Sequence, residues 1–353
     1  MNTLKRIIFC SILFGTFLFS ACSTDLDVIG NYKETIVVYG LLDQAQDTQY
    51  VKINKAFLGA GNALVYAQVK DSTQFVNALS VELRRIKNGV QLGATILLMP
   101  TNKPKDPGIF YSADQTNAIY SFVSTGVNAL HPDSEYELTV SNNETGTVVT
   151  SKTSLVSDIT GFTSPMPGGA TFGFVSVSSP NYPFNVVWSS AKNARIYQVI
   201  IRLNYVDSLI TGENVAHVVD YTLPSLKTLN ISASTPELME VDTKGRDFYK
   251  YIGNTLLDYT GLIKRTVGNV DLLLVAGSDE LSTFIDVNTP STGIIQERPE
   301  YTNINNGLGL FSARLNRAPD SRPLNATSWD SLVCGQYTKQ LKFVNSSGIH
   351  PCL

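Results

Sequence analysis

The chain has 353 residues, of which 43% are hydrophobic, so it can form more than one domain core. Its 30 acidic residues outnumber 27 basic ones and no basic stripe stands out, which argues against nucleic acid as a partner. Plentiful Tyr, Phe, Val, Ile and Thr favour strands over helices. The longest apolar run beyond the N-terminal region, residues 272–276, is far shorter than a membrane-spanning helix.

The N-terminus has the pattern of a secretory signal. Lys5 and Arg6 provide a basic start, residues 7–19 are almost wholly apolar, and Ser20 and Ala21 are small. The apolar run is shorter than the roughly 20 residues that cross a bilayer, as is usual for signal peptides. We therefore predict a signal peptide over residues 1–21. Its removal takes away both basic residues and changes the net charge from −3 to −5.

Cys22 follows the small residues directly, and residues 19–22 resemble a bacterial lipobox, in which the cysteine is acylated and becomes the first mature residue. The alternative is simple secretion with cleavage nearby, which would leave Cys22 as an ordinary thiol. Lipidation is favoured because Cys22 stands where an ordinary signal cleavage would otherwise fall. Each buried methylene contributes about 0.8 kcal/mol, so several acyl chains would hold the protein on its membrane. Residues 22–34 are expected to be the tether.

Residues 35–156 are predicted to form an immunoglobulin- or fibronectin-type β-sandwich. Seven short segments carry strand patterns: residues 35–42, 50–56, 80–86, 93–99, 119–124, 136–142 and 147–153. In residues 50–56, for example, apolar and polar side chains alternate with the period of a half-buried strand. Asn88 and Gly89 suit the two positive φ angles of a tight hairpin turn. Seven short alternating strands are typical of such a sandwich.

Residues 130–140 (LHPDSEYELTV) resemble the tyrosine corner of fibronectin-type sandwiches, with Leu130, Pro132 and Tyr136 at its structural positions. In that corner the tyrosine hydroxyl bonds to backbone a few residues upstream. His131 lies within the motif and could suggest catalysis. A solvated corner residue explains it better.

Residues 157–170, rich in Gly, Pro, Ser and Thr, are predicted to be a linker before a larger β-rich domain over residues 171–353. Strand patterns occupy residues 184–188, 195–205, 215–221, 226–231, 271–276, 283–287, 304–312 and 341–344, with Trp329 in a loop. One helix is expected near residues 243–260, because apolar residues recur there at three- and four-residue steps. We expect that apolar stripe to pack against a sheet.

Cysteine usage supports an oxidising location. Cys10 is lost with the signal and Cys22 carries lipid, which leaves Cys334 and Cys352 as a pair. In the periplasm or on a cell surface such a pair is most simply a disulfide that closes the C-terminal tail into a loop. The alternative, a metal site, has only His350 nearby as a further ligand.

No motif with recognisable catalytic or cofactor spacing is present. Residues 306–311 are half of a dinucleotide-binding glycine pattern without its strand–turn–helix setting, so close strand packing explains them better. Residues 242–247 lack the spacing of a calcium loop and are read as a helix start. Paired carboxylates such as Asp279 and Glu280 would serve glycoside hydrolysis only if the fold set the right two apart. We expect no cofactor, no metal and no enzymatic activity.

Several short stretches together resemble a family of Bacteroidota lipoproteins whose domain has no known function. They are the lipobox ending at Cys22, residues 36–42, residues 130–140, Trp188 with Tyr197, and the asparagine- and glycine-rich residues 301–311. The resemblance implies a β-sandwich N-terminal domain, an outer-membrane lipoprotein, and genes that often lie beside those of TonB-dependent receptors. It supplies no activity and no functional residues.

We therefore expect a lipid-anchored outer-membrane protein, exposed at the surface, that acts as a non-enzymatic binding or accessory module with a TonB-dependent receptor or another envelope partner. Tyr301, Phe311 and Trp329 are candidate partner contacts, although core packing would explain these aromatic residues too. The alternatives are a structural or adhesive surface protein, or a cell-surface hydrolase of glycans or peptides. The oligomeric state is left open.

The lipobox generates a testable prediction. Cells grown with a clickable fatty-acid probe should incorporate it into the wild-type protein, and Cys22→Ala should abolish the label because the acyl acceptor is gone. Gel fluorescence of the immunoprecipitated protein is the measurement, with Cys10→Ala as the matched control that keeps full labelling. Label retained by Cys22→Ala would contradict the anchor.

Overall fold

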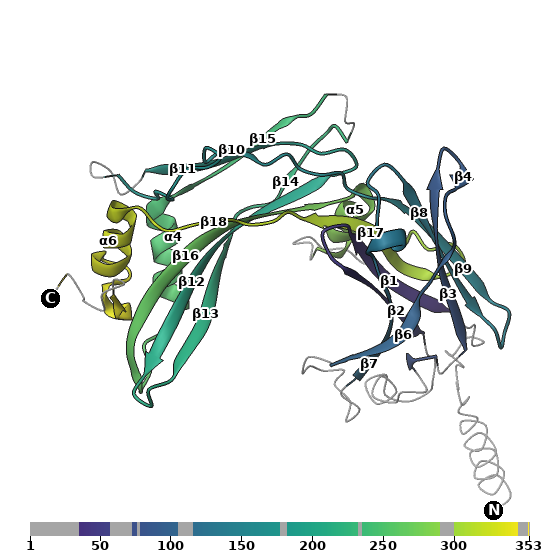
Figure 1. Ribbon diagram of the computed structural model, residues 1–353, viewed down its shortest axis with the longest axis horizontal. Coiled ribbons are helices and arrows are strands. Elements are labelled where there is room, and N and C mark those ends of the chain that lie inside the picture. Colours follow the sequence, from purple (N-terminus) through teal and green to yellow (C-terminus); the bar gives the residue numbers. More distant parts are fainter. Residues whose placement is uncertain are drawn as a thin grey trace, which may run out of the picture.

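The computed structural model describes residues 35–56, 73–75, 78–104, 116–176, 182–231, 235–289, 300–344 and 352. The signal peptide, Cys22, the tether and His350 lie outside these residues. The fold is mainly β, as predicted, and its two lobes lie side by side (Figure 1). Within the described ranges, no helix is long and apolar enough to cross a membrane.

The N-terminal lobe is a β-sandwich, which confirms the predicted fold class. One layer contains β1 (Ile36–Asp43), β2 (Thr48–Lys55), β7 (Thr116–Val123) and β6 (Met99–Pro104); the other contains β4 (Val90–Gln91), β3 (Leu79–Lys87), β8 (Glu135–Asn142) and β9 (Val148–Ser154), with β5 (Ile96–Leu97) beside β3. A short 3-10 helix, η1 (Gly126–Asn128), precedes the corner. Alternate residues such as Val38, Val51 and Val140 are fully buried between the layers. Asn88 (φ 51°) and Gly89 (φ 77°) make the predicted turn between β3 and β4.

The corner motif has the hydrogen bond that its sequence predicts. Tyr136 is 1% exposed, and its hydroxyl accepts a bond from the backbone N–H of His131 at 2.8 Å. Leu130 and Pro132 are half-buried just upstream. Burial raises the pKa of Tyr136, because the ionised phenolate would lose its hydration. The motif therefore fixes the backbone of the crossover that leads into β8.

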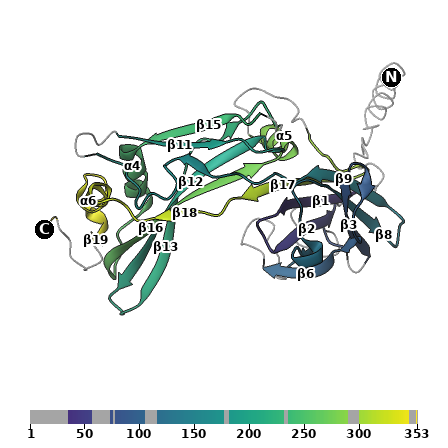
Figure 2. The same ribbon diagram turned by 45° about the horizontal axis from the view of Figure 1, so that its top comes forward.

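The C-terminal lobe packs a small sheet and two helices against a long curved one. The small sheet contains β10 (Phe162–Ser164), β11 (Pro183–Ser189) and β15 (Leu238–Lys244); the long sheet contains β13 (Asn214–Thr222), β12 (Ile196–Leu209) and β16 (Leu262–Gly277), with β14 (Leu226–Lys227), β18 (Asp320–Arg322) and β19 (Phe343–Val344) paired at its margins. The helices at the far end are α4 (Gly245–Thr255) and α6 (Ala326–Cys334), followed by the 3-10 helix η2 (Lys339–Leu341) (Figure 2). One apolar core joins these layers.

The same tyrosine device appears in this second lobe. The hydroxyl of Tyr197 accepts a hydrogen bond from the backbone N–H of Ala191 at 2.7 Å, and its ring lies 5.7 Å from that of Trp188. Burial raises the pKa of Tyr197 to about 12. Each lobe thus fixes the entry to a central strand with a buried phenol, and each has its own core.

The helix expected near residues 243–260 is α4, which is shorter at both ends, and two further helices were not predicted. Residues 283–287, predicted as a strand, belong to α5 (Asp279–Asn288). Trp329, predicted in a loop, lies in α6. Each helix has a start signal that outweighs its β-branched residues: acidic residues fill the first turn of α5, and the Asn325 side chain accepts from Ser328 N–H at the start of α6.

The strand β17 (Leu308–Asn316) joins the two lobes. It runs parallel to β1 over seven residue pairs, from Val37 with Leu308 to Asp43 with Arg314. Its last residues also pair antiparallel with β16 (Figure 1). Phe311 belongs to the N-terminal core and Leu315 to the C-terminal core. A strand from the end of the chain therefore completes the first lobe and continues its sheet into the second.

The asparagine- and glycine-rich stretch before and within β17 acts as a clamp. The Asn303 side chain accepts from Phe311 N–H at 2.9 Å and donates to Phe311 C=O at 2.6 Å. Gly309 has φ +110° and lies so close to β1 that a Cβ atom would be 2.0 Å from the Val38 carbonyl oxygen. Phe311 itself is 0% exposed. It packs inside the sandwich and cannot contact a partner, so the expectation that Phe311 is a partner contact is wrong.

The clamp predicts that Gly309→Ala is strongly destabilising. The new Cβ would clash with β1, and an alanine at positive φ is strained as well. Together these effects should lower the free energy of unfolding by about 3 kcal/mol. Gly89→Ala is the matched control, because Gly89 also has positive φ (77°) but nothing within 4 Å of its Cβ position. It should cost only about 1–2 kcal/mol. Thermal unfolding midpoints of the two variants measure the difference, and equal midpoints would contradict the close β1–β17 packing.

A disulfide, a buried ion pair and the pairing of β19 with β16 attach the C-terminal tail to the second lobe. Cys334 and Cys352 form a disulfide, with Cα atoms 5.6 Å apart. The buried Arg265 side chain donates to Leu341 C=O at 2.9 Å and lies 3.1 Å from the buried carboxylate of Asp207. An ion pair removed from water needs such complete bonding to be tolerated. The pair therefore braces η2 against β12 and β16.

The cysteine pair gives a second stability prediction. Non-reducing peptide mapping of protein from its native envelope should join the peptide that contains Cys334 to the one that contains Cys352. Cys352→Ser should lower the stability of the C-terminal lobe by about 3 kcal/mol, the loop entropy for a separation of 18 residues. Hydrogen exchange should speed up in β19 but not in β8. Two free thiols in the native protein would refute the bridge.

Candidate functional site

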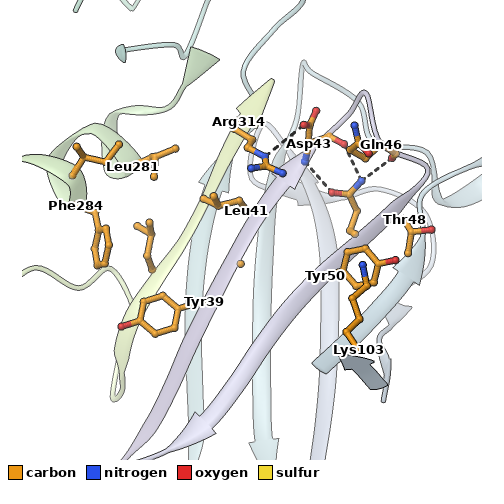
Figure 3. Close-up of a pocket in the computed structure, with 14 residues that line it drawn as sticks. Tyr39, Leu41, Asp43, Gln46, Thr48, Tyr50, Lys103, Leu281, Phe284 and Arg314 are labelled. Carbon is orange, nitrogen blue, oxygen red and sulfur yellow. Dashed lines mark hydrogen bonds and ion pairs between the residues drawn. The ribbon is translucent and has the colours of Figure 1, made fainter. Parts of the chain in front are cut away.

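An open hollow of about 640 Å³ lies where the two lobes meet (Figure 3). Its floor is the outward face of β1 and β17, including Leu41 and Leu310. One wall is α5, which contributes Leu281 and Phe284, and the other comes from β2 and β6. We call this hollow, together with a smaller one that continues it, the β1–α5 groove. Junctions between domains are frequent places for ligand sites.

Strand alternation supplies the floor of the groove. The residues of β1 that alternate with its core residues point outward, so Tyr39 and Leu41 face the groove while Val38 and Leu42 are fully buried. The helix α5 is held above β17 because its N-cap residue Ser278 donates its N–H to Ala313 C=O at 3.0 Å. The groove therefore depends on α5, which follows β16, and on the part of the sheet that β1 and β17 form.

Aromatic side chains stand on both sides of the groove. Tyr39, 46% exposed, meets Phe284 edge-to-face with ring centroids 6.2 Å apart. On the opposite side Tyr50 is 38% exposed, and the ammonium of Lys103 lies 3.6 Å from the centre of its ring. Both pairs are visible in Figure 3. Such edge-to-face and cation–π contacts hold the rings in fixed orientations.

One end of the groove is polar and well braced. The carboxylate of Asp43, 2% exposed, accepts from Ala45 N–H at 3.0 Å and lies 3.6 Å from Nε of Arg314 (Figure 3). The buried Gln49 side chain accepts from Asp43 N–H and donates to the carbonyls of Asp43 and Gln46, which fixes the turn between β1 and β2. Arg314 itself is 44% exposed and lines the groove.

The groove continues past Tyr39 into a second hollow of about 300 Å³. Tyr39 and Phe284 line both hollows, and Tyr301, Glu300 and Leu308 line only the second. Burial raises the pKa of Tyr301, and the carboxylates of α5 raise it further because they disfavour a second negative charge nearby. Tyr301 therefore keeps its proton and can donate a hydrogen bond at neutral pH.

The three aromatic residues proposed from the sequence lie in different places. Tyr301 lines the groove, and Phe311 is buried in the sandwich core. Trp329 is partly buried on α6, packed against the C-terminal core at the opposite end of the molecule (Figure 2). The structure therefore brings Tyr301 alone of the three to the groove.

Sequence reasoning missed the other groove residues. The signal for Tyr39 was present, since a large aromatic at an outward position of an alternating strand is worth noting. Phe284 and Arg314 had no such signal, because their segments were assigned to other strands or to none and nothing local placed them beside β1.

The charged lining of the groove consists of two carboxylates and two cationic side chains. Of the residues that line its two hollows, Asp43 and Glu300 carry the carboxylates, and Asp43 is already engaged by Arg314. Among the described residues, no histidine or cysteine lines either hollow. In the described ranges, no group of three or more His, Cys, Asp or Glu residues is arranged to hold a metal ion. A nucleophile–base pair is not assembled by these lining residues.

A second polar cluster lies in the other lobe, around Asp207. Its carboxylate accepts from the Tyr259 hydroxyl at 2.8 Å and pairs with Arg265, while His217 lies 3.9 Å away and stacks on Tyr205. The hydrogen bond to Asp207 raises the pKa of Tyr259. These groups bond to one another and to the backbone of the tail, so a structural role in stabilising the lobe explains the cluster.

No protein-family model matches the chain, and no curated protein matches it. Among solved structures, it is similar to the C-terminal globular domain of the oligosaccharyltransferase from Pyrococcus abyssi, with 9% identity and a TM-score of 0.28. The match covers 83% of this chain and 50% of that chain. A likeness at this level assigns neither a shared fold nor an activity.

Proposed function

We propose that this protein is a lipid-anchored, non-enzymatic binding module of the cell envelope whose ligand occupies the β1–α5 groove. The observation that carries the proposal is the groove itself: an open hollow of about 640 Å³, with ordered aromatic rings on both sides and a braced polar end. Exposed aromatic side chains held in fixed orientations provide contact area at little entropic cost.

Anchoring and location belong to the same proposal. Acylated Cys22 would hold the protein on the outer membrane, facing the cell surface. The 13 residues from Cys22 to the end of the tether could extend up to about 45 Å, at roughly 3.3–3.6 Å per residue. That reach would let the groove approach a neighbouring TonB-dependent receptor, the partner that the family resemblance implies.

A hydrolase is less well supported than a binding module. Glycoside hydrolysis needs two carboxylates about 5–9.5 Å apart, one of them able to donate a proton. Asp43 is buried beside Arg314 and lines the first hollow, whereas Glu300 lines only the second, so the two carboxylates do not face one common space. Peptide hydrolysis would need a nucleophile and base or a metal, and the lining residues assemble neither.

The proposal is tested by filling the groove. Leu41→Glu places a charged side chain on the groove floor, and Leu229→Glu, at a 91% exposed position in the other lobe, is the matched control. Detergent-purified mature protein is heated with concentrated growth medium and envelope extract, fractionated by size. A ligand at about 100 times its dissociation constant stabilises by about 2.7 kcal/mol, which raises the unfolding midpoint by a few degrees.

Wild type and Leu229→Glu should show this shift in the same fractions, and folded Leu41→Glu should not. Circular dichroism confirms that each variant is folded. A shift that persists in Leu41→Glu would show that the ligand binds elsewhere, and no shift in any fraction would count against a binding module.

A further inference from the structure

We infer that the ligand of the β1–α5 groove is an oligosaccharide, an inference that rests on the proposed binding function. The groove runs beside β1 and β17 from Arg314 to Leu308, a span of about 20 Å at roughly 3.3 Å per strand residue. Both hollows are partly open to solvent. A groove of this length accommodates several linked units of a chain.

The backbone of the groove floor argues against an extended peptide. Peptides that bind along a strand use main-chain hydrogen bonds to an unpaired sheet edge. Both edges of β1 are occupied, by β17 on one side and β2 on the other. A peptide in this groove would leave its own amides without main-chain partners from the floor, whereas a sugar chain has no backbone amides to satisfy.

The side chains of the groove fit the two-sided chemistry of a sugar ring. A pyranose has a face of C–H groups, which packs on the electron-rich face of an aromatic ring, and a rim of hydroxyls. Tyr39 is the best platform, because it is 46% exposed, common to both hollows and held by the edge contact with Phe284. Tyr50 has one face covered by Lys103 and is placed to flank the chain.

The polar side chains of the groove include hydrogen-bond donors and acceptors, and the positive charges equal the negative charges in number. Arg314 and Lys103 can donate, Glu300 can accept, and Gln46 and Thr48 can do both. Sugar hydroxyls also donate and accept, so such a mixture suits them. Two cations beside two carboxylates do not make a site for a polyanion such as nucleic acid. An acyl chain would favour an enclosed, wholly apolar cavity, and this groove is open and polar at one end.

The test uses detergent-purified mature protein on two arrays. One carries neutral oligosaccharides of four to eight units from glucans, xylans and mannans, and the other carries unrelated ten-residue peptides. Hits are titrated by calorimetry. Tyr39→Ala should bind the hit sugar at least tenfold more weakly, and Tyr39→Phe, which keeps the ring, should bind within about threefold of wild type. Tyr182→Ala is the matched control, because Tyr182 is 47% exposed in the other lobe.

The outcomes separate the ligand class from the binding function. Loss of sugar binding in Tyr39→Ala with retention in Tyr39→Phe and Tyr182→Ala supports the inference. An empty sugar array, a peptide hit that depends on Tyr39, or unchanged sugar binding by Tyr39→Ala overturns it. If the extract-induced stabilisation is still lost in Leu41→Glu, the binding function stands and the sugar assignment alone fails. If that stabilisation is absent as well, both fail.

Discussion

The parallel pairing of β1 with β17 is the contact on which the rest of this structure depends. It joins residues some 270 positions apart, Asp43 and Arg314 among them, and it adds Phe311 and Ala313 to the N-terminal core. The same strand ends against β16 in the second lobe. Parallel pairing this close requires a nearly bare backbone, which Gly309 provides, and Asn303 holds the neighbouring peptide of Phe311.

The groove forms because β17 pairs with β1. Once β17 lies beside β1, the chain that enters it brings Tyr301 to the same face, and α5 is held over β17 through Ser278. The outward residues of β1 then face a helix on one side and the β2–β6 edge on the other. The core of the sandwich and the proposed ligand surface are therefore opposite faces of one strand.

In both lobes a buried tyrosine bonds to the backbone that leads into a central strand. Tyr136 and Tyr197 each bury a phenol whose hydroxyl accepts a backbone N–H five or six residues upstream. A buried amide without such a partner would cost about 1–3 kcal/mol, so each phenol both fills the core and satisfies the crossover. The second lobe differs in the length of β12 and β16, whose far ends are braced by Arg265 and Asp207.

The sequence by itself determined the mainly β class, the N-terminal sandwich, the Asn88–Gly89 turn, the Tyr136 corner and the position of α4, because each rests on contacts within a few residues or on a local period. It also singled out the cysteine pair. The tertiary structure alone decided that Phe311 is buried and that Tyr39, Phe284 and Arg314 share a groove. It also decided that residues 279–288 form the helix α5, although their β-branched residues suggested a strand, and its N-cap residue Ser278 bonds to Ala313 of β17. These features depend on pairing between distant segments, whose register is fixed by packing and has no signature in any one of them.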